Sequence, residues 1–219
     1  ARKANRFKVF EKPLQKIIDL KKQEAELLGY EHHPYDALLN EYDKGITVQQ
    51  LDKIFSSLAE KLEPIMLGQQ KKSQVQQDIY SGKHFPQDHQ WNFGIQMLRE
   101  MHFNFDKGRQ DISAHPFTTS FGSSDVRVTT RIDEKNPANM IWSCMHELGH
   151  ALYEQGLPAE EYGMPLGEAC SLSIHESQSR IWENCIGRSL AFWEHQFPNL
   201  KKYFPHQLKN ISTVDFYRG

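Results

Sequence analysis

The sequence contains little cysteine and no long apolar run. Its 219 residues include 3 cysteines, Cys144, Cys170 and Cys185, and none of them belongs to a Cys-x-x-Cys pair. An odd and sparse set of cysteines does not make a disulfide framework and is typical of a reducing compartment. The apolar runs are far shorter than the about 20 residues that cross a bilayer, and no charged and then apolar leader opens the chain. We therefore expect a cytoplasmic protein with no membrane partner.

An excess of charge of either sign is also absent. Lysine and arginine total 26, aspartate and glutamate total 28, and the formal net charge is −2. Nucleic-acid-binding domains usually carry a strongly basic surface, so we expect no nucleic-acid partner. Hydrophobic residues make up 38% of the chain and charged residues 25%, which is typical of a soluble globular protein.

Most of the chain has the apolar periodicity of helices. The segments in which apolar residues recur at helical spacing are 11–28, 47–66 and 86–101. Thr47 and Gln50 form a capping box at the start of the second segment. Residues 114–132 instead contain two β-branched, alternating runs separated by Gly122, which predicts a hairpin of two short strands. The sequence therefore predicts a mainly α fold with a small β-hairpin or sheet.

A His-Glu-x-x-His sequence lies within a further helical pattern that Asn136 and Pro137 open. Residues four apart on a helix share one face, so His146 and His150 can bind the same metal ion. Glu147 lies beside the first of these ligands, where a carboxylate can act as general base on a metal-activated water. Because this short pattern also arises by chance, the residues that follow it decide its meaning.

A catalytic zinc site needs a third protein ligand and one open position. The next predicted helix, at residues 166–186, carries Glu168 and Glu176, which lie 18 and 26 residues beyond His150, and Glu183 further out. The residues alone leave this choice open.

Four blocks in this order resemble one family of peptidases. They are His115-Pro116-Phe117, Asp125-x-Arg127-x-Thr129, His146-Glu147-x-x-His150 and His175-Glu176-Ser177-Gln178. With these blocks the chain resembles the M32 family of metallocarboxypeptidases, also called the carboxypeptidase Taq family. Residues 34–39 also resemble the family, so the likeness extends over nearly the whole chain.

The resemblance implies a helical zincin-type peptidase fold, related to neurolysin and angiotensin-converting enzyme, with a small sheet beside the metal helix. It implies that Glu176 is the third ligand beside His146 and His150, and that zinc or cobalt is the metal. It also implies a homodimeric carboxypeptidase that removes single amino acids from the C-termini of peptide substrates. In such an enzyme Glu147 takes the proton of the attacking water and passes it to the leaving amine.

One difference from the family concerns length. Family members are longer and continue with the motifs Gly-x-x-Gln-Asp-x-His-Trp and Ile-Arg-x-x-Ala-Asp, which are thought to hold the terminal carboxylate of the substrate. This chain ends before both motifs. We therefore expect residues 1–219 to form a single partial catalytic domain that is not necessarily active alone. Its expected parts are N-terminal helices in 1–110, the hairpin in 114–132, the metal helices in 137–187 and truncated C-terminal helices in 188–219.

Six further residues are expected to contact the substrate or to support the metal ligands. They are His115, Asp125, Arg127, Thr129, His175 and Gln178. His175 is a candidate oxyanion donor, with a residue outside this chain as the alternative. Asp125 and Arg127 can order the sheet, touch the substrate or form a plain ion pair. His115 is either a donor behind a metal ligand or simply a residue at the start of a strand.

Two other functions stay open at this point. An oligopeptidase or endopeptidase of the same clan would keep the metal site and lack an anchor for the terminal carboxylate. An inactive, truncated helical module would bind metal only for structure or assembly. Glu147 argues against the second function, because a closed structural site has no use for a base beside an open coordination position.

Overall fold

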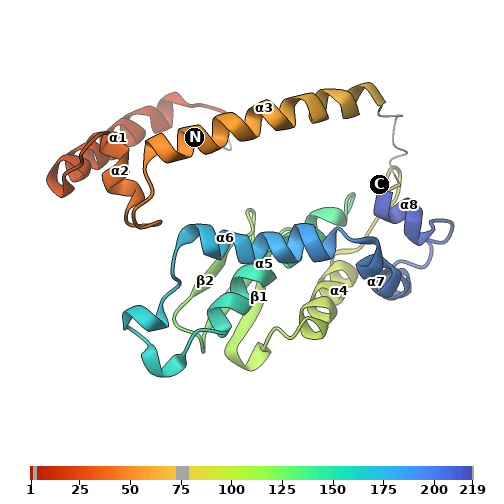
Figure 1. Ribbon diagram of the computed structural model, residues 1–219. Coiled ribbons are helices and arrows are strands. Elements are labelled where there is room, and N and C mark those ends of the chain that lie inside the picture. Colours follow the sequence, from red (N-terminus) through yellow and green to blue (C-terminus); the bar gives the residue numbers. More distant parts are fainter. Residues whose placement is uncertain (2–3, 73–78, 219) are drawn as a thin grey trace. The chain divides into compact units, whose positions relative to one another are not determined.

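The structure is a computed structural model that describes residues 1, 4–72 and 79–218 (Figure 1). Contacts between residues divide the chain into two compact units, Ala1–Ser73 and Gln74–Gly219. Both units are built mainly from helices, and the second also contains a three-stranded sheet. The mainly α prediction with a small sheet is therefore confirmed.

The first unit contains α1 (Lys8–Leu28), α2 (Pro34–Leu39) and α3 (Val48–Lys72). Helix α1 ends where Gly29 adopts a φ of 79°, a conformation that favours glycine. The predicted capping box is present at the start of α3. The Gln50 N–H donates to Thr47 Oγ1 at 3.3 Å, and the Thr47 N–H donates to Gln50 Oε1 at 3.0 Å. These local signals fix where the helices begin and end.

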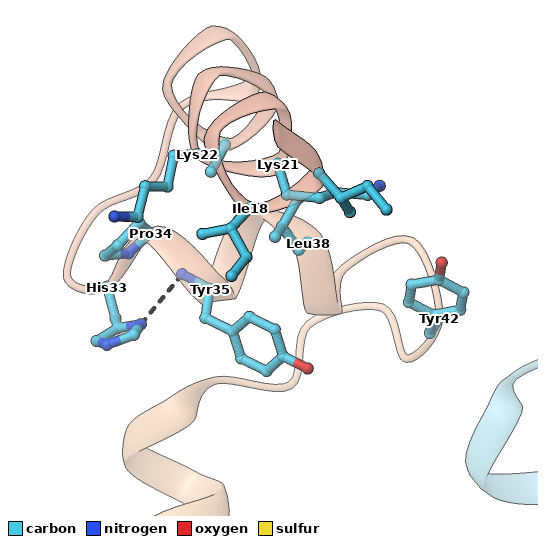
Figure 2. A pocket seen from close by; sticks show the side chains of 10 residues that line it. Ile18, Lys21, Lys22, His33, Pro34, Tyr35, Leu38 and Tyr42 are labelled. Atoms are coloured by element: carbon cyan, nitrogen blue, oxygen red, sulfur yellow. Dashed lines mark hydrogen bonds between the residues drawn. The ribbon is translucent and has the colours of Figure 1, made fainter. Parts of the chain in front are cut away.

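A mostly apolar pocket of about 460 Å³ lies between α1 and α2 (Figure 2). Ile18 of α1 and Leu38 of α2 are among the side chains that line it. At its edge the His33 ring accepts a hydrogen bond from the Tyr35 N–H at 3.1 Å and caps α2. Ala25 is the one buried apolar residue among the described residues of this unit. The role of His33 in this structure is therefore that of the N-cap of α2.

The described residues of the second unit, 79–218, form five α-helices, three strands and several short helical turns. The α-helices are α4 (Gln87–Glu100), α5 (Ala138–Gln155), α6 (Leu172–Arg180), α7 (Leu190–Tyr203) and α8 (Thr213–Arg218). The strands are β1 (Gly108–Ile112), β2 (Thr118–Ser120) and β3 (Val126–Thr130). Short 3₁₀ turns occupy Phe105–Lys107, Ala159–Glu161 and Pro165–Gly167, and a π-helical segment, η5, occupies Ile181–Gly187.

The sheet has the strand order β1-β3-β2. Strands β2 and β3 are antiparallel, with Thr118 opposite Val128, and together form the hairpin expected in residues 114–132. Strand β1 pairs in parallel with β3, with Gly108 opposite Val126, and was not predicted. Because β3 lies between the other two strands, β2 is left at an edge of the sheet.

Helix α5 crosses the core of the second unit. Met140, Met145 and Leu148 on one of its sides are 0% exposed. Other large side chains that are fully buried in this core include Phe85, Phe93, Met97, Leu98, Ile141, Trp193, Phe197, Leu200, Phe204 and Leu208. Helix α5 packs against β3 and α6, and Figure 1 shows α6 running beside it. The core therefore fixes the helix that carries the His-Glu-x-x-His sequence.

Two predicted boundaries differ from the structure. The helix expected at residues 166–186 begins at Leu172, because the Ser171 hydroxyl caps it by accepting from the Ile174 N–H at 3.2 Å. Strand β1 lies across residue 110, where the N-terminal helical region was expected to end. Of the predicted segments 1–110 and 188–219, residues 2–3, 73–78 and 219 lie outside the described residues.

Candidate metal centre

Helix α5 presents the two histidines of the His-Glu-x-x-His sequence on one face. The predicted start of this helix is confirmed, because Asn136 Oδ1 accepts from the Ala138 N–H at 3.0 Å. One turn separates His146 from His150, and their Nε2 atoms are 3.3 Å apart. Burial and the neighbouring His175 and His146 lower the pKa of His150 to about 4. This ring is therefore neutral at pH 7, the state in which it can bind a metal.

Glu176 on helix α6 supplies the third converging atom. Its Oε2 lies 3.4 Å from His150 Nε2 and 3.8 Å from His146 Nε2. The other oxygen, Oε1, accepts a hydrogen bond of 2.8 Å from Arg180 Nε. Within the described residues, His146, His150 and Glu176 are the one group of three or more histidine, cysteine or acidic side chains that could hold a metal ion.

A glycine within the motif lets the two helices approach closely. A Cβ atom at Gly149 would collide with the backbone at Ser179 and would lie 2.6 Å from the backbone oxygen of Gln178. Real Cβ contacts are essentially never shorter than 3.0 Å. Only glycine therefore fits at this contact, which brings Glu176 within reach of the histidines.

The spacing of the three atoms fits a tetrahedral metal site. Ligand atoms at 2.0–2.1 Å from a tetrahedral zinc lie about 3.3–3.4 Å from one another. The observed separations are 3.3, 3.4 and 3.8 Å. Two imidazole nitrogens and one carboxylate oxygen are also a donor set used by catalytic zinc, with one position left for water. The residues present therefore suit a divalent metal of this kind.

Glu147 is nearly buried beside this centre, with 6% of the residue exposed. Thr118 Oγ1, on the edge strand β2, donates a hydrogen bond of 2.6 Å to Glu147 Oε2. Burial raises the pKa of the Glu147 carboxyl, and the hydrogen bond from Thr118 opposes that rise. The position next to His146 and the raised proton affinity are what a general base needs.

A carboxylate stands behind His146. His146 Nδ1 lies 3.0 Å from Glu183 Oε2, and Arg188 binds the other oxygen of Glu183 at 3.0 Å. Burial alone would raise the pKa of Glu183, but the hydrogen bonds from His146 and Arg188 outweigh it and lower the pKa. Glu183 is therefore ionised and orients the His146 ring, as carboxylates commonly do for metal-binding histidines.

His150 has a histidine behind it in place of a carboxylate. Its Nδ1 lies 2.6 Å from His175 Nδ1, and His175 Nε2 lies 2.6 Å from Glu154 Oε1. Both nitrogens of His175 are thus occupied by protein partners. This geometry does not support the oxyanion-donor role expected for His175.

The remaining predicted residues lie in and around the hairpin or at the helix contact. Arg127 donates to both carboxylate oxygens of Asp125, at 2.9 and 2.7 Å, and the pair is a half-exposed ion pair within the hairpin. Thr129 Oγ1 accepts from the Phe117 N–H at 2.9 Å, so it fixes the chain that enters β2. His115 is exposed and its Nδ1 lies 2.8 Å from the Pro116 oxygen.

Two predicted residues remain, Gln178 of this group and Glu168, the alternative third ligand. The backbone of Gln178 forms part of the helix contact at Gly149. Glu168 is exposed just after a 3₁₀ turn and is not part of the metal group.

The contacts of Thr118, Glu154 and Glu183 with the residues of this centre were not predicted from the sequence. Glu154 lies four residues beyond His150 and Glu183 lies seven beyond Glu176, so each shares a helix face with a metal-ligand candidate. That spacing is a signal that could have found both. Thr118 gave no such signal, because its contact with Glu147 joins a strand to a helix.

The comparisons with known proteins agree with this geometry. The family model described as carboxypeptidase Taq (M32) metallopeptidase matches residues 1–219. Carboxypeptidase 1 of Bacillus subtilis is 38% identical over 213 residues, which cover 97% of this chain and 42% of that protein. Thermostable carboxypeptidase 1 of Pyrococcus furiosus is 41% identical over 216 residues, which cover 96% of this chain and 42% of that protein. The chain therefore spans less than half the length of these relatives.

Solved structures give the same result. The crystal structure of an M32 carboxypeptidase from Deinococcus radiodurans matches with a TM-score of 0.90 and 40% identity, over 100% of this chain and 44% of that one. The Pyrococcus furiosus carboxypeptidase structure matches with a TM-score of 0.89 and 39% identity, over 99% of this chain and 44% of that one. This chain belongs to the carboxypeptidase Taq (M32) family of metallopeptidases.

Proposed function

We propose that this chain carries the metal centre of a carboxypeptidase that removes single amino acids from the C-termini of peptides. The observation that carries the proposal is the convergence of His146 Nε2, His150 Nε2 and Glu176 Oε2, with separations of 3.3 to 3.8 Å. Glu147 beside them supports a catalytic role over a structural one, because a structural metal site needs no adjacent base. Membership of the M32 family supports the carboxypeptidase activity.

Zinc is the metal we propose, with cobalt as a substitute. Imidazole and carboxylate donors suit both ions, and zinc is the usual metal of a two-histidine, one-glutamate site. A metal bound there supplies Lewis acidity, which polarises a peptide carbonyl and makes water acidic near neutral pH.

Side chains of this protein then carry out the proton transfer and hold the reacting groups in place. Glu147 accepts the proton of the attacking water and delivers it to the nitrogen of the leaving amino acid. Thr118 holds the carboxylate of Glu147 by the hydrogen bond of 2.6 Å to its Oε2. Glu183 and His175 keep the two histidine rings in place from behind.

Peptide substrates have a natural docking edge beside this centre. Strand β2 is an edge strand next to α5, and an extended peptide can pair with such an edge through its backbone. Backbone pairing accepts many sequences, so we expect broad specificity. Selection of a free C-terminus requires in addition an anchor for the terminal carboxylate.

Assembly and location form a further part of the proposal. The resemblance to the family supports a homodimer, and a cytoplasmic location agrees with the free thiols of Cys144, Cys170 and Cys185. In the part of the chain that the structure describes, no helix is long and apolar enough to span a membrane. Light scattering coupled to size-exclusion chromatography measures the assembly state.

The decisive experiment offers two peptides as substrates to the natural full-length protein loaded with zinc. One peptide has a free C-terminal carboxylate and its twin is amidated. We expect release of single amino acids from the free peptide alone. Internal cleavage of the amidated peptide would instead favour an oligopeptidase, and inertness of the zinc-loaded protein towards both would refute the proposed function.

Replacement of the base tests the mechanism in the same assay. We expect Glu147→Gln to lower kcat by about 10² to 10⁴, the usual contribution of a general base, while zinc still binds. The matched control is Glu160→Gln, an exposed acidic residue in a 3₁₀ turn, which should retain full activity. Survival of activity in Glu147→Gln would remove the assigned role.

A further inference from the structure

His175 lies between the metal-ligand candidate His150 and the carboxylate of Glu154. The two Nδ1 atoms of His150 and His175 are 2.6 Å apart, and His175 Nε2 lies 2.6 Å from Glu154 Oε1. All three side chains are mostly buried, with 15%, 18% and 14% of the side chains of His150, His175 and Glu154 exposed. These residues form a continuous chain of hydrogen bonds that ends at the metal centre.

The direction of these hydrogen bonds follows from which groups can donate a proton. An ionised carboxylate only accepts hydrogen bonds, so the proton facing Glu154 sits on His175 Nε2. The contact between the two Nδ1 atoms holds one proton, which either ring can carry. On His175 Nδ1 it would leave a neutral His150 protonated on Nε2, the atom that converges with Glu176 and His146. A metal can bind at His150 Nε2 only when the shared proton is on His150 Nδ1. His150 Nε2 is consequently left with a free lone pair, directed at Glu176 and His146.

Glu154 is well placed to remain ionised. Ser120 Oγ, on β2, donates a hydrogen bond of 2.8 Å to its second oxygen. The hydrogen bond with His175 lowers the pKa of the Glu154 carboxyl, against the opposing effect of burial. Both oxygens of Glu154 therefore have donors, and its orientation is fixed from two sides.

We propose that Glu154 and His175 are positioning residues that set the tautomer of His150 and keep its Nε2 available for the metal. The inference rests on the proposed metal site and assigns to it two residues outside the ligand set. It also distinguishes the two ligand histidines, because His146 is held directly by Glu183, whereas His150 is held by a carboxylate one imidazole away.

The first test needs no substitution. Long-range proton–nitrogen NMR correlations of the metal-free, natural full-length protein identify the tautomer of each histidine. We expect His150 to be protonated on Nδ1 and His175 on Nε2. Protonation of His150 on Nε2, or of His175 on Nδ1, would overturn the inference whether or not metal binds.

The second test measures zinc affinity by competition with a chromophoric chelator. Glu154→Met removes the acceptor and keeps the side-chain length, and we expect the zinc Kd to rise by about 10- to 100-fold. Glu154→Gln retains an acceptor oxygen for His175 Nε2–H, so its Kd should lie between those of the wild type and Glu154→Met. Glu160→Met, on an exposed turn, is the matched control and should bind as the wild type does.

The zinc affinities distinguish failure of this inference from failure of the proposed function. Absence of zinc binding in the unsubstituted protein would refute the metal site itself, and the NMR result would still decide the tautomer. If the unsubstituted protein binds zinc and Glu154→Met binds equally well, the metal site stands and the positioning role is wrong. Equal weakening in Glu154→Met and Glu154→Gln would also contradict it, because the acceptor oxygen would then make no difference.

Discussion

Thr118 Oγ1 donates a hydrogen bond of 2.6 Å to Oε2 of Glu147 and also lies 3.2 Å from the backbone oxygen of the same residue. Thr118 belongs to the edge strand β2, and Glu147 belongs to the metal helix α5. A residue of the edge strand therefore positions the expected general base by a direct hydrogen bond.

Loss of this hydrogen bond should slow the reaction without removing the metal. A hydrogen bond to a charged group contributes about 1.5–3 kcal/mol, so we expect Thr118→Val to lower kcat by about 10- to 100-fold. Thr118→Ser retains the hydroxyl and should stay near the wild-type rate. The measurements are kcat and the zinc Kd. Thr119→Val, at the neighbouring position on the opposite face of β2, is the control, and equal rates in both valine variants would contradict the prediction.

Metal should stabilise the folded protein in proportion to its affinity. Zinc at a thousand times its Kd adds about 4 kcal/mol to the free energy of unfolding, so removal of zinc by a chelator should lower the melting temperature. We expect Glu176→Ala to lose this stabilisation, because one of the three converging atoms is gone. Glu168→Ala, the exposed alternative ligand, should keep it. Calorimetric scans with and without zinc give the result, and an unchanged zinc response in Glu176→Ala would exclude Glu176 as a ligand.

A methyl group at Gly149 should separate the two helices that carry the proposed metal ligands. Gly149→Ala places a Cβ against the backbone of Ser179 and Gln178, which cannot move as a flexible side chain could. We expect lower thermal stability and weaker zinc binding, because Glu176 moves away with α6. Gly68→Ala is the matched control, since nothing lies within 4 Å of its Cβ in α3 and alanine favours a helix. Equal zinc affinity in the two variants would show that the close approach is not needed.

The three cysteines should differ in reactivity towards alkylating reagents. Burial raises the pKa of the Cys144 thiol to about 12, so at pH 8 it remains protonated and inert. Cys170 and Cys185 are exposed. Mass spectrometry after brief alkylation should find two modified cysteines in the native protein and three after denaturation in guanidinium. Rapid alkylation of Cys144 in the native protein would be inconsistent with the buried position of this helix face.

The features that sequence predicts well are local. The spacing of His146 and His150 places both on one helix face by the geometry of the helix alone, and the capping box at Thr47 lies within four residues. The alternation around Gly122 also predicted the β2–β3 hairpin. Spacing alone did not identify the third metal ligand, because Glu168 and Glu176 were both candidates. The resemblance to the family favoured Glu176, which is the glutamate found beside the two histidines.

The features that sequence missed depend on contacts between distant segments. Strand β1 carries the charged Arg109 and Asp111 and pairs in parallel with β3, so no turn signal links the two. The hydrogen bond from Ser120 to Glu154 spans 34 residues. Neither contact leaves a periodic pattern in the sequence, and only the folded sheet brings these residues to the metal helix.

Thr118 and Ser120 are alternate residues of a three-residue strand, and both donate to carboxylates of α5. Alternate residues of a strand point to the same side, so a shift of the strand by one residue turns both hydroxyls to the opposite face. An insertion or deletion of one residue in the segment before β2 would then remove the support of Glu147 and of Glu154 in a single event. The length of that segment is therefore under a constraint that no individual substitution reveals.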